Sequence, residues 1–208
     1  MIKRNILQGN PATSLYQQLS NYYEIFFPLK EARLALIASL LKKEHLAILD
    51  VGCADGELAL SISRAGRRVL GIDSEPAMIT KAREKAKTRN LAAAFMEKDM
   101  SRLAEDFPAA SFDVVLCFGN TIPHLDGLER IEEFIDSVYK ILVKGGACIL
   151  QVVNYAKILA NSIEALPVIE KENLVMRRSY EYDRTAHRIL FKVQVAPSSP
   201  PGAAGFAS

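Results

Sequence analysis

Short apolar runs alternate with longer amphipathic segments between Leu46 and Asn154. The short runs are rich in residues that favour strands, and the longer segments have the apolar spacing of helices. Alternation of this kind is typical of a parallel sheet covered by helices on both faces. The pattern predicts an α/β fold with a Rossmann-like, doubly wound, mostly parallel sheet. Its strands are expected at 47–51, 68–72, 92–97, 112–118 and 147–153.

Local signals mark the helix ends between these strands. Ser74 stands where it could cap a helix, and Asp126 with Glu129 resembles a capping box. The tripeptide KGG predicts a turn between the third of these helices and the fifth strand. The helices are expected at 57–65, 76–89, about 126–142 and about 155–164.

The segment before the first strand also has helical character. Helices are expected at 13–23 and 30–42, separated by Pro28, and the second has a broad apolar stripe suited to packing on the sheet. Together they predict an N-terminal helical lid over residues 1–45. Aromatic residues of this lid could close a site, although packing is their commoner role. They are Tyr16, Tyr22 and Tyr23.

The sequence pattern changes after the fifth strand. Strand-forming residues on both sides of the turn DRTAH predict a C-terminal antiparallel β-hairpin near 168–195. On it, Arg177, Arg178 and Tyr180 could meet an acidic substrate, and a solvated face that protects the sheet edge is the alternative for the arginines. The final stretch, 196–208, cannot build a core, which predicts a disordered tail, a truncation or a frameshift.

These elements predict a single domain over 1–195, because 208 residues are short for two independent domains. Within it, 46–155 is the expected cofactor-binding core, and the helix and hairpin of 156–195 form a substrate-side element. If the chain is truncated near Ala196, the sheet edge stays open and should seek a partner. That possibility predicts a homodimer.

Composition and charge exclude several classes of function. Half of the residues are apolar and the net charge is +2, with no sustained positive stripe, so no nucleic-acid partner is expected. Neither a signal peptide nor an apolar run of roughly 18 residues is visible, which predicts a cytoplasmic protein without a membrane span. The cysteine spacing does not suit zinc, so no metal is expected. The cysteines are Cys53, Cys117 and Cys148.

The most informative segment is ILDVGCADG at 48–56, where an expected strand runs directly into a helix. Small residues at Gly52, Ala54 and Gly56 permit a tight turn and let a ligand approach the backbone. The start of the following helix offers unpaired N–H donors. A ligand with acceptor atoms is therefore expected at this turn.

Two ligand classes compete for the turn. A dinucleotide fingerprint would place its third glycine at Glu57, and an anionic side chain is unsuited to a pyrophosphate. Asp50 in the strand and Asp55 in the turn add negative charge. The loop therefore favours a ligand that carries positive charge, and a nicotinamide-dependent oxidoreductase remains as the weaker alternative.

The segment resembles motif I of class I S-adenosylmethionine-dependent methyltransferases, in which an acidic residue precedes x-Gly-x-Gly-x-Gly. Ala54 replaces the middle glycine, and the resemblance covers about residues 46–155. It implies S-adenosyl-L-methionine as the cofactor, whose ammonium and sulfonium give the acidic loop a physical reason. The residues that it assigns to the cofactor are Asp50, Gly52, Ala54, Gly56, Asp73, Ser74, Met78, Asp99, Met100 and Cys117.

Asp73 ends the second expected strand, where a carboxylate can accept hydrogen bonds from both ribose hydroxyls. Taken alone, Asp73 could equally cap a helix. The resemblance implies that Met78 lies against the adenine ring, with Asp99 near the adenine amine and the Met100 N–H on a ring nitrogen. Core packing is the alternative for Met78.

The strings GNTIPHL and VVNY, after the fourth and fifth strands, resemble the glycine and sarcosine N-methyltransferase-like branch. This implies in-line methyl transfer to a small molecule, with an amine nitrogen as acceptor. An amine must be neutral to attack, so nearby polar groups are candidates for taking its proton. For His124, a place before the next helix is an equal alternative. The candidates are Asn120, His124, Asn154 and Tyr155.

Two further functions stay open. A methyltransferase of RNA or protein is disfavoured by the missing basic surface and by the absence of an Asn-Pro-Pro-Tyr type motif after the fourth strand. A non-catalytic module that binds S-adenosylmethionine or a partner is the other alternative, because the C-terminal sequence is unusual for the family.

Overall fold

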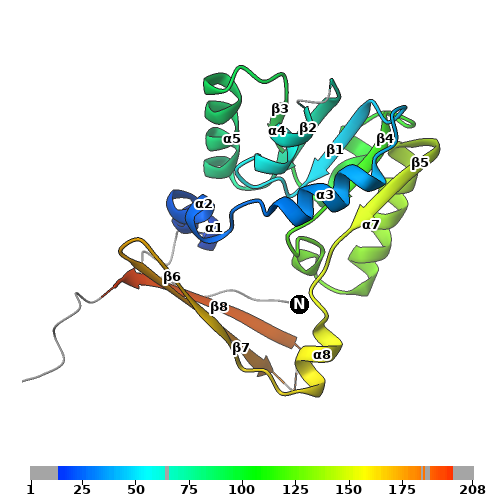
Figure 1. The fold of residues 1–208 in the computed structure, drawn as a ribbon. Helices are drawn as coiled ribbons and strands as arrows, with labels where there is room; N and C mark the ends of the chain where they lie inside the picture. The colour runs from blue at the N-terminus through cyan, green and yellow to red at the C-terminus, as the bar shows by residue number, and fades with distance from the viewer. Residues whose placement is uncertain (1–13, 64–65, 184, 186–187, 199–208) are drawn as a thin grey trace, which may run out of the picture.

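The main sheet has five parallel strands in the order β3-β2-β1-β4-β5 (Figure 1). The computed structural model describes residues 14–63, 66–183, 185 and 188–198. The strand order reverses beside β1, so the predicted doubly wound α/β sheet is confirmed. The strands are β1 Ala47–Val51, β2 Arg68–Asp73, β3 Ala94–Glu97, β4 Phe112–Cys117 and β5 Leu142–Leu150.

Helices cover both faces of this sheet, and the burial of β1 shows it. Ile48 belongs to a core with residues of α3, α4 and α5, and the next residue, Leu49, belongs to a second core with α6 and α7. Because successive side chains of a strand point to opposite faces, every residue of β1 is buried. These helices are α3 Glu31–Leu40, α4 Glu57–Ser63, α5 Pro76–Thr88, α6 Leu103–Asp106 and α7 Leu128–Ile141.

Three predicted helix-end signals are wrong. Glu75, not Ser74, occupies the cap position of α5. The cap position of α7 is Gly127 with φ of 97°, so Asp126 does not form the capping box. The tripeptide KGG lies inside β5 as a bulge, and the pairing with β4 shifts register across it. Tertiary pairing overrides the local turn signal there.

The predicted lid is helical but more broken than expected. Within it, α3 buries Ile37 completely, whereas Leu36 and Leu40 are 54% and 46% exposed. The apolar residues of α3 surround the helix, so the expected broad packing stripe does not form. The other lid elements are α1 Leu15–Leu19, the 3-10 helix η1 Ser20–Tyr22 and α2 Tyr23–Phe26.

The predicted C-terminal hairpin is present as β7 and β8, and a further antiparallel strand, β6, joins it. This second sheet lies below the main sheet in Figure 1, and α8 leads into it from β5. It packs on the lid through Leu19 and Phe26, which contact Met176 and Val193 in one apolar cluster. The elements are α8 Tyr155–Ala160, β6 Ala165–Lys171, β7 Leu174–Asp183 and β8 Arg188–Pro197.

Strand β8 continues to Pro197, two residues into the stretch expected to be a tail. The rest of that tail, 199–208, lies outside the described residues, as do positions 184, 186 and 187 of the predicted turn DRTAH. In the part of the chain that the structure describes, no helix is long and apolar enough to cross a membrane.

Candidate cofactor and acceptor site

A cavity of about 720 Å³ opens at the carboxyl ends of the central strands. The ends of β1 and β2 supply Gly52 and Asp73, and the loops after β3 and β4 supply Asp99 and Thr121. Its volume lies within the ordinary range for small-molecule sites, which is roughly 300–1,000 Å³. This is also where ligands bind in open parallel sheets, beside the reversal of strand order.

Gly52 has a conformation and surroundings that exclude a side chain. Its φ is +70°, and a Cβ atom there would lie 2.4 Å from Cγ2 of Thr121. Ala54 also has a positive φ, of 49°, although it carries a Cβ. The backbone N–H groups of Gly52 and Cys53 donate to the Ile72 carbonyl at 2.8 and 2.9 Å, which ties this bend to β2. The bend thus keeps its backbone close to the cavity.

Asp73 holds the same bend from the end of β2. Its Oδ2 accepts the Ala54 N–H at 2.9 Å, and its Oδ1 accepts the Glu75 N–H at 3.0 Å. A carboxylate that receives two backbone donors is fixed in position and stabilised as an anion. Asp73 also lines the cavity, so it offers a fixed negative charge to a ligand.

Asp50 lies in β1, two residues before Gly52, and is only 2% exposed. Its Oδ2 has no hydrogen-bond partner among the described residues. Burial raises the pKa of Asp50 to about 7, and the nearby Asp73 charge adds to the effect. An orphaned buried carboxylate oxygen is costly unless a ligand satisfies it. Asp50 lies behind the cavity lining, and its carboxylate with that of Asp73 forms a set of acceptors that fits a ligand with an ammonium group, as S-adenosylmethionine has.

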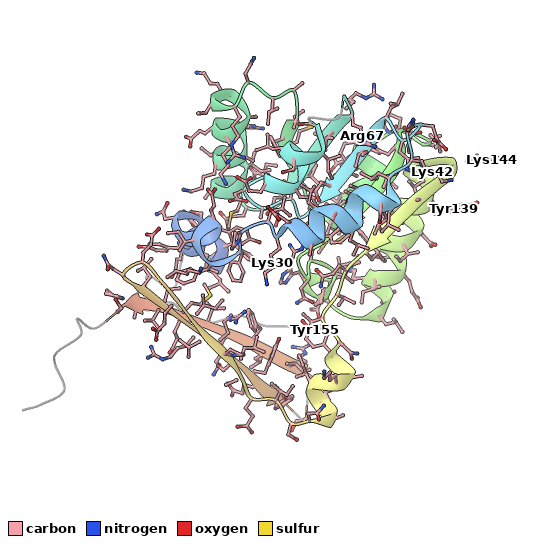
Figure 2. The ribbon with its side chains drawn as sticks, in the orientation of Figure 1. Lys30, Lys42, Arg67, Tyr139, Lys144 and Tyr155 are labelled. Carbon is pink, nitrogen blue, oxygen red and sulfur yellow. The ribbon has the colours of Figure 1, made fainter. Side chains whose placement is uncertain are left out.

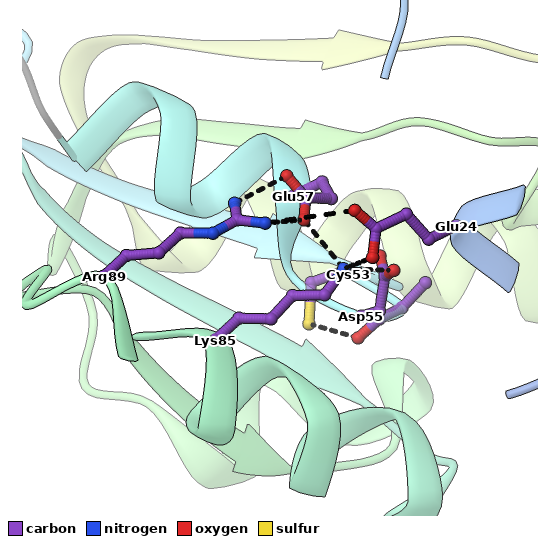
Figure 3. A network of polar contacts seen from close by, with 7 residues as sticks. Glu24, Cys53, Asp55, Glu57, Lys85 and Arg89 are labelled. Atoms are coloured by element: carbon purple, nitrogen blue, oxygen red, sulfur yellow. Dashed lines mark hydrogen bonds and ion pairs between the residues drawn. The ribbon is translucent and has the colours of Figure 1, made fainter. Parts of the chain in front are cut away.

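The other acids of the bend are neutralised by two cations of α5 (Figure 3). Lys85 Nζ lies 2.7 Å from Asp55 Oδ2, 2.7 Å from Glu57 Oε1 and 2.9 Å from Glu24 Oε2 of the lid. Arg89 forms a bidentate pair with Glu57 at 2.7 and 2.9 Å. Asp55 and Glu57 lie outside the cavity lining.

The expectation that Asp55 and Glu57 present negative charge to the ligand is therefore wrong. Their charges are compensated on the side of the loop that faces α5 and the lid. The charge of Glu57 therefore no longer argues against a pyrophosphate at this bend. The preference for a cationic ligand now depends on Asp50 and Asp73.

Two other residues assigned to the cofactor lie behind the cavity lining. A Cβ atom on Gly56 would come within 2.7 Å of the Phe95 ring and 2.9 Å of Ala82, so Gly56 lets α4 begin close to β3 and α5. Cys117 is fully buried, and burial raises the pKa of its thiol to about 12. Both residues pack the fold behind the cavity, and their predicted role in cofactor binding stays a prediction.

The predicted adenine-side residues do line the cavity. Met78 is 1% exposed and still contributes to the wall. Asp99 accepts the Ser101 N–H at 2.9 Å, which fixes its carboxylate at the start of the 3-10 helix η2 Met100–Arg102. The members of this group are Ser74, Met78, Asp99 and Met100.

Of the four predicted catalytic residues, only His124 lines the cavity. It belongs to the 3-10 helix η3 Ile122–His124, and its Nε2 lies 3.2 Å from the hydroxyl of Tyr16 in the lid. The two rings meet edge to face with centroids 5.9 Å apart. This pair spans the cavity from the β4 loop to the lid.

The other three candidates join the loops after β4 and β5. The Asn120 amide donates to the Tyr155 hydroxyl at 2.6 Å and accepts the Val153 N–H at 3.0 Å. Asn154 accepts the Lys157 N–H at 2.9 Å and so caps α8. These bonds hold the loops after β4 and β5 together beside the cavity. The three residues themselves lie outside the cavity lining.

Sequence patterns missed several lining residues. Lys98 and Arg130 are each paired with an acid, Asp106 and Glu133, at 2.7 Å. Positions after strand ends carry a general signal for ligand contact, but Lys98 and Arg130 belong to no motif. Phe118 and Gly119 lie between the predicted site residues Cys117 and Asn120. Of the lid tyrosines, Tyr16 and Tyr23 line the cavity. The missed residues include Lys98, Ser101, Thr121, Leu125, Asp126 and Arg130.

Comparison with known proteins agrees with this site. Residues 48–146 match the family model described as a methyltransferase domain. The chain is 34% identical over 113 residues to a demethylmenaquinone methyltransferase of Thermus thermophilus, a match that covers 53% of this chain and 48% of that enzyme. The chain spans about half the length of the curated relatives that it matches.

Solved structures share the fold. The CcbJ methyltransferase of Streptomyces caelestis superposes with a TM-score of 0.71 at 20% identity, covering 89% of this chain and 82% of that one. An amino pentose methyltransferase of Micromonospora echinaspora, solved with S-adenosylmethionine bound, gives 0.61 at 17% identity, covering 92% and 85%. The solved structures show that the fold is shared, and the matched model over 48–146 is that of a methyltransferase domain.

The raised pKa of Asp50 predicts a pH dependence of stability. A carboxyl whose folded pKa is about 7, against an ordinary value of 3.8, contributes stability below about pH 4 that is lost as the pH rises through 7. Asp50→Asn removes this loss. In urea denaturation we expect it to be more stable than wild type at pH 8, by on the order of a few kcal/mol, with the gain shrinking towards pH 5. Asp136→Asn, at an exposed position of α7, is the control, and an equal gain there would contradict the assignment.

The ion pairs of Lys85 predict a second effect on stability. Lys85→Met should cost about 3 kcal/mol in the free energy of unfolding, because it leaves the buried Asp55 carboxylate without its cation. Lys87→Met, on the exposed side of the same helix, should change it little. Adding Asp55→Asn to Lys85→Met should recover most of the loss. No recovery in thermal or urea denaturation would show that the network is not energetically coupled.

Proposed function

We propose that this protein transfers the methyl group of S-adenosylmethionine to an amine nitrogen of a small molecule. The observation that carries the proposal is the cavity at the reversal of strand order, where the Gly52 bend and Asp73 meet beside the orphaned Asp50. The domain match over 48–146 supports the class of reaction. The glycine and sarcosine N-methyltransferase-like branch stays a prediction.

The lining, together with the buried Asp50 behind it, offers each part of the cofactor a suitable partner. Asp73 is placed to accept hydrogen bonds from the ribose hydroxyls, and Met78 with Met100 forms an apolar wall for the adenine. The Asp99 carboxylate is an acceptor for the adenine amine. Asp50 can balance the ammonium of the amino-acid part, because its buried oxygen lacks a partner among the described residues. When bound, the cofactor supplies a methyl carbon that its sulfonium has already activated.

The acceptor side is bounded by Tyr16 and His124. Methyl transfer needs alignment more than a strong base, so holding the nucleophile near the methyl supplies much of the rate. An amine acceptor must still lose a proton, and the His124 imidazole with the Tyr16 hydroxyl at 3.2 Å can take or relay it.

A methyltransferase of RNA or protein is the second candidate, and the lid beside the cavity disfavours it. A macromolecular substrate needs an open surface, whereas Tyr16 and Tyr23 of the lid form part of the wall here. RNA binding that weakens steeply with salt would favour that candidate. Tight cofactor binding with no transfer to any acceptor would favour a non-catalytic module instead.

The first test concerns the cofactor, with S-adenosylhomocysteine titrated by calorimetry. Asp73→Asn should weaken its binding by roughly tenfold or more, since a charge-assisted contact at the ribose is lost. Asp113→Asn is a matched control, because Asp113 also accepts two backbone N–H groups, at 3.0 and 2.8 Å, but at the amino end of the sheet. Equal losses in both variants would assign Asp73 a purely structural role.

The second test concerns the acceptor. We expect transfer of a radiolabelled methyl group to members of an amine panel and none to the alcohol of the same skeleton. His124→Asn should lower kcat roughly a hundredfold and shift the pH profile, while S-adenosylhomocysteine affinity is unchanged. His45→Asn, remote in the loop before β1, is the control. Transfer to the alcohols alone would contradict the nitrogen acceptor.

A further inference from the structure

The first lid elements, α1, η1 and α2, share an apolar core with the second sheet. Leu19 and Phe26 of the lid form one buried cluster with Met176 and Val193 of the second sheet. Among the described residues, no member of this cluster belongs to either core that flanks the main sheet. A close-packed core resists deformation, so these elements should behave as one unit. We call α1, η1, α2 and the second sheet the cap, and the main sheet with α3 to α7 the body.

Two segments of the described chain connect the cap with the body. The first, 27–30, joins α2 to α3, and the second, 151–164, joins β5 to β6 and contains α8. Figure 2 labels Lys30 in the first segment and Tyr155 in the second, and both lie between the two sheets. Asn120 of the body donates to the Tyr155 hydroxyl, so the second segment can turn only beyond that residue. A few residues at the ends of elements are sufficient to form a hinge.

Polar side chains bind the cap to the body at three places among the described residues. The Ser14 hydroxyl donates to the Glu75 carboxylate before α5. The Tyr16 hydroxyl lies 3.2 Å from His124 Nε2. The third place is an ion pair of α2 with α5. Polar pairs of this kind contribute little net free energy, because water replaces each partner when they separate. The boundary is therefore suited to opening.

The ion pair lies at the bend after β1 (Figure 3). Glu24 of α2 is 2.9 Å from Lys85 Nζ and 4.0 Å from Arg89 Nη2. The same Lys85 amine is 2.7 Å from both Asp55 of the bend and Glu57 of α4. The Glu24 side chain is 58% exposed, whereas that of Asp55 is 6% exposed. Within this network, the Glu24 contact is thus the one that can break without leaving a buried charge unpaired.

We propose that the cap opens and closes over the cavity as one body, and that Glu24 holds it closed through Lys85 and Arg89. Entry and release of the cofactor then require this contact to break, because Tyr16 and Tyr23 of the cap line the cavity. The motion itself is inferred from the packing and the ion pair. Its role in cofactor exchange rests on the proposed function. Glu24 is a positioning residue, since it acts through the place of the cap.

The first experiment measures distances between spin labels by pulsed electron spin resonance, without ligand. Labels at Gln17→Cys and Arg177→Cys lie within the cap, and labels at Arg177→Cys and Lys87→Cys span the boundary with α5. Both pairs carry Cys148→Ala, because Cys148 is exposed and would be labelled as well. Raising sodium chloride from about 0.05 M to about 0.5 M screens the ion pair. We expect the distance across the boundary to lengthen and the distance within the cap to stay the same.

The matched variants test Glu24 as the residue that holds the cap closed. Glu24→Gln should show the longer distance across the boundary already at low salt. Glu31→Gln, an exposed acid of α3 in the body, should match wild type. A change within the cap as large as that across the boundary overturns the proposal, because the lid then moves without the second sheet. A fixed distance across the boundary, or a Glu24→Gln variant that equals wild type, also overturns it.

The second experiment tests cofactor exchange by stopped-flow measurement of S-adenosylhomocysteine release. Glu24→Gln should release it roughly threefold faster than wild type at low salt, and Glu31→Gln at the wild-type rate. The difference should vanish at high salt, where the wild-type ion pair is screened. Faster release that persists at high salt would contradict the role of the ion pair. If calorimetry detects no binding of S-adenosylhomocysteine to wild type, the proposed function fails, while the label distances still decide whether the cap moves.

Discussion

The Asp73 carboxylate joins the two loops on which the site depends. One oxygen accepts the N–H of Ala54 after β1, and the other accepts the N–H of Glu75 after β2. With the bonds from Gly52 and Cys53 to the Ile72 carbonyl, it holds a bend in which Gly52, Ala54 and Gly56 have positive φ. These hydrogen bonds fix the backbone of Gly52 and Ala54, which forms part of the cavity wall.

Charge around the site falls into two groups. Asp55 and Glu57 are compensated by Lys85 and Arg89, and Glu24 extends that network to the lid. The buried Asp50 carboxyl keeps one oxygen without a hydrogen-bond partner among the described residues. Since the cost of burying such a group is normally offset by a ligand, Asp50 suggests a cationic group close to the Gly52 bend.

The strands and the cofactor-side loop could be predicted from sequence because their signals are local. Apolar runs found β1 to β4 within about two residues, and the glycine motif led to Gly52 and Asp73. The roles of side chains after the strands could not be predicted in this way. Asn120 and Tyr155 were candidates for catalysis, yet their bond to each other ties two loops together. A polar residue near a site looks the same in sequence whether it faces the ligand or its neighbours.

The sequence by itself determined the α/β alternation, the parallel sheet and the tight bend after β1, because these depend on periodicity and on small residues at fixed spacing. Only the tertiary structure decided which charges face the cavity. Lys85 and Glu57 are 28 positions apart, and Tyr16 and His124 are 108 apart. Compensation of a charge depends on which distant side chain folding brings within hydrogen-bond reach, and a linear pattern does not contain that distance.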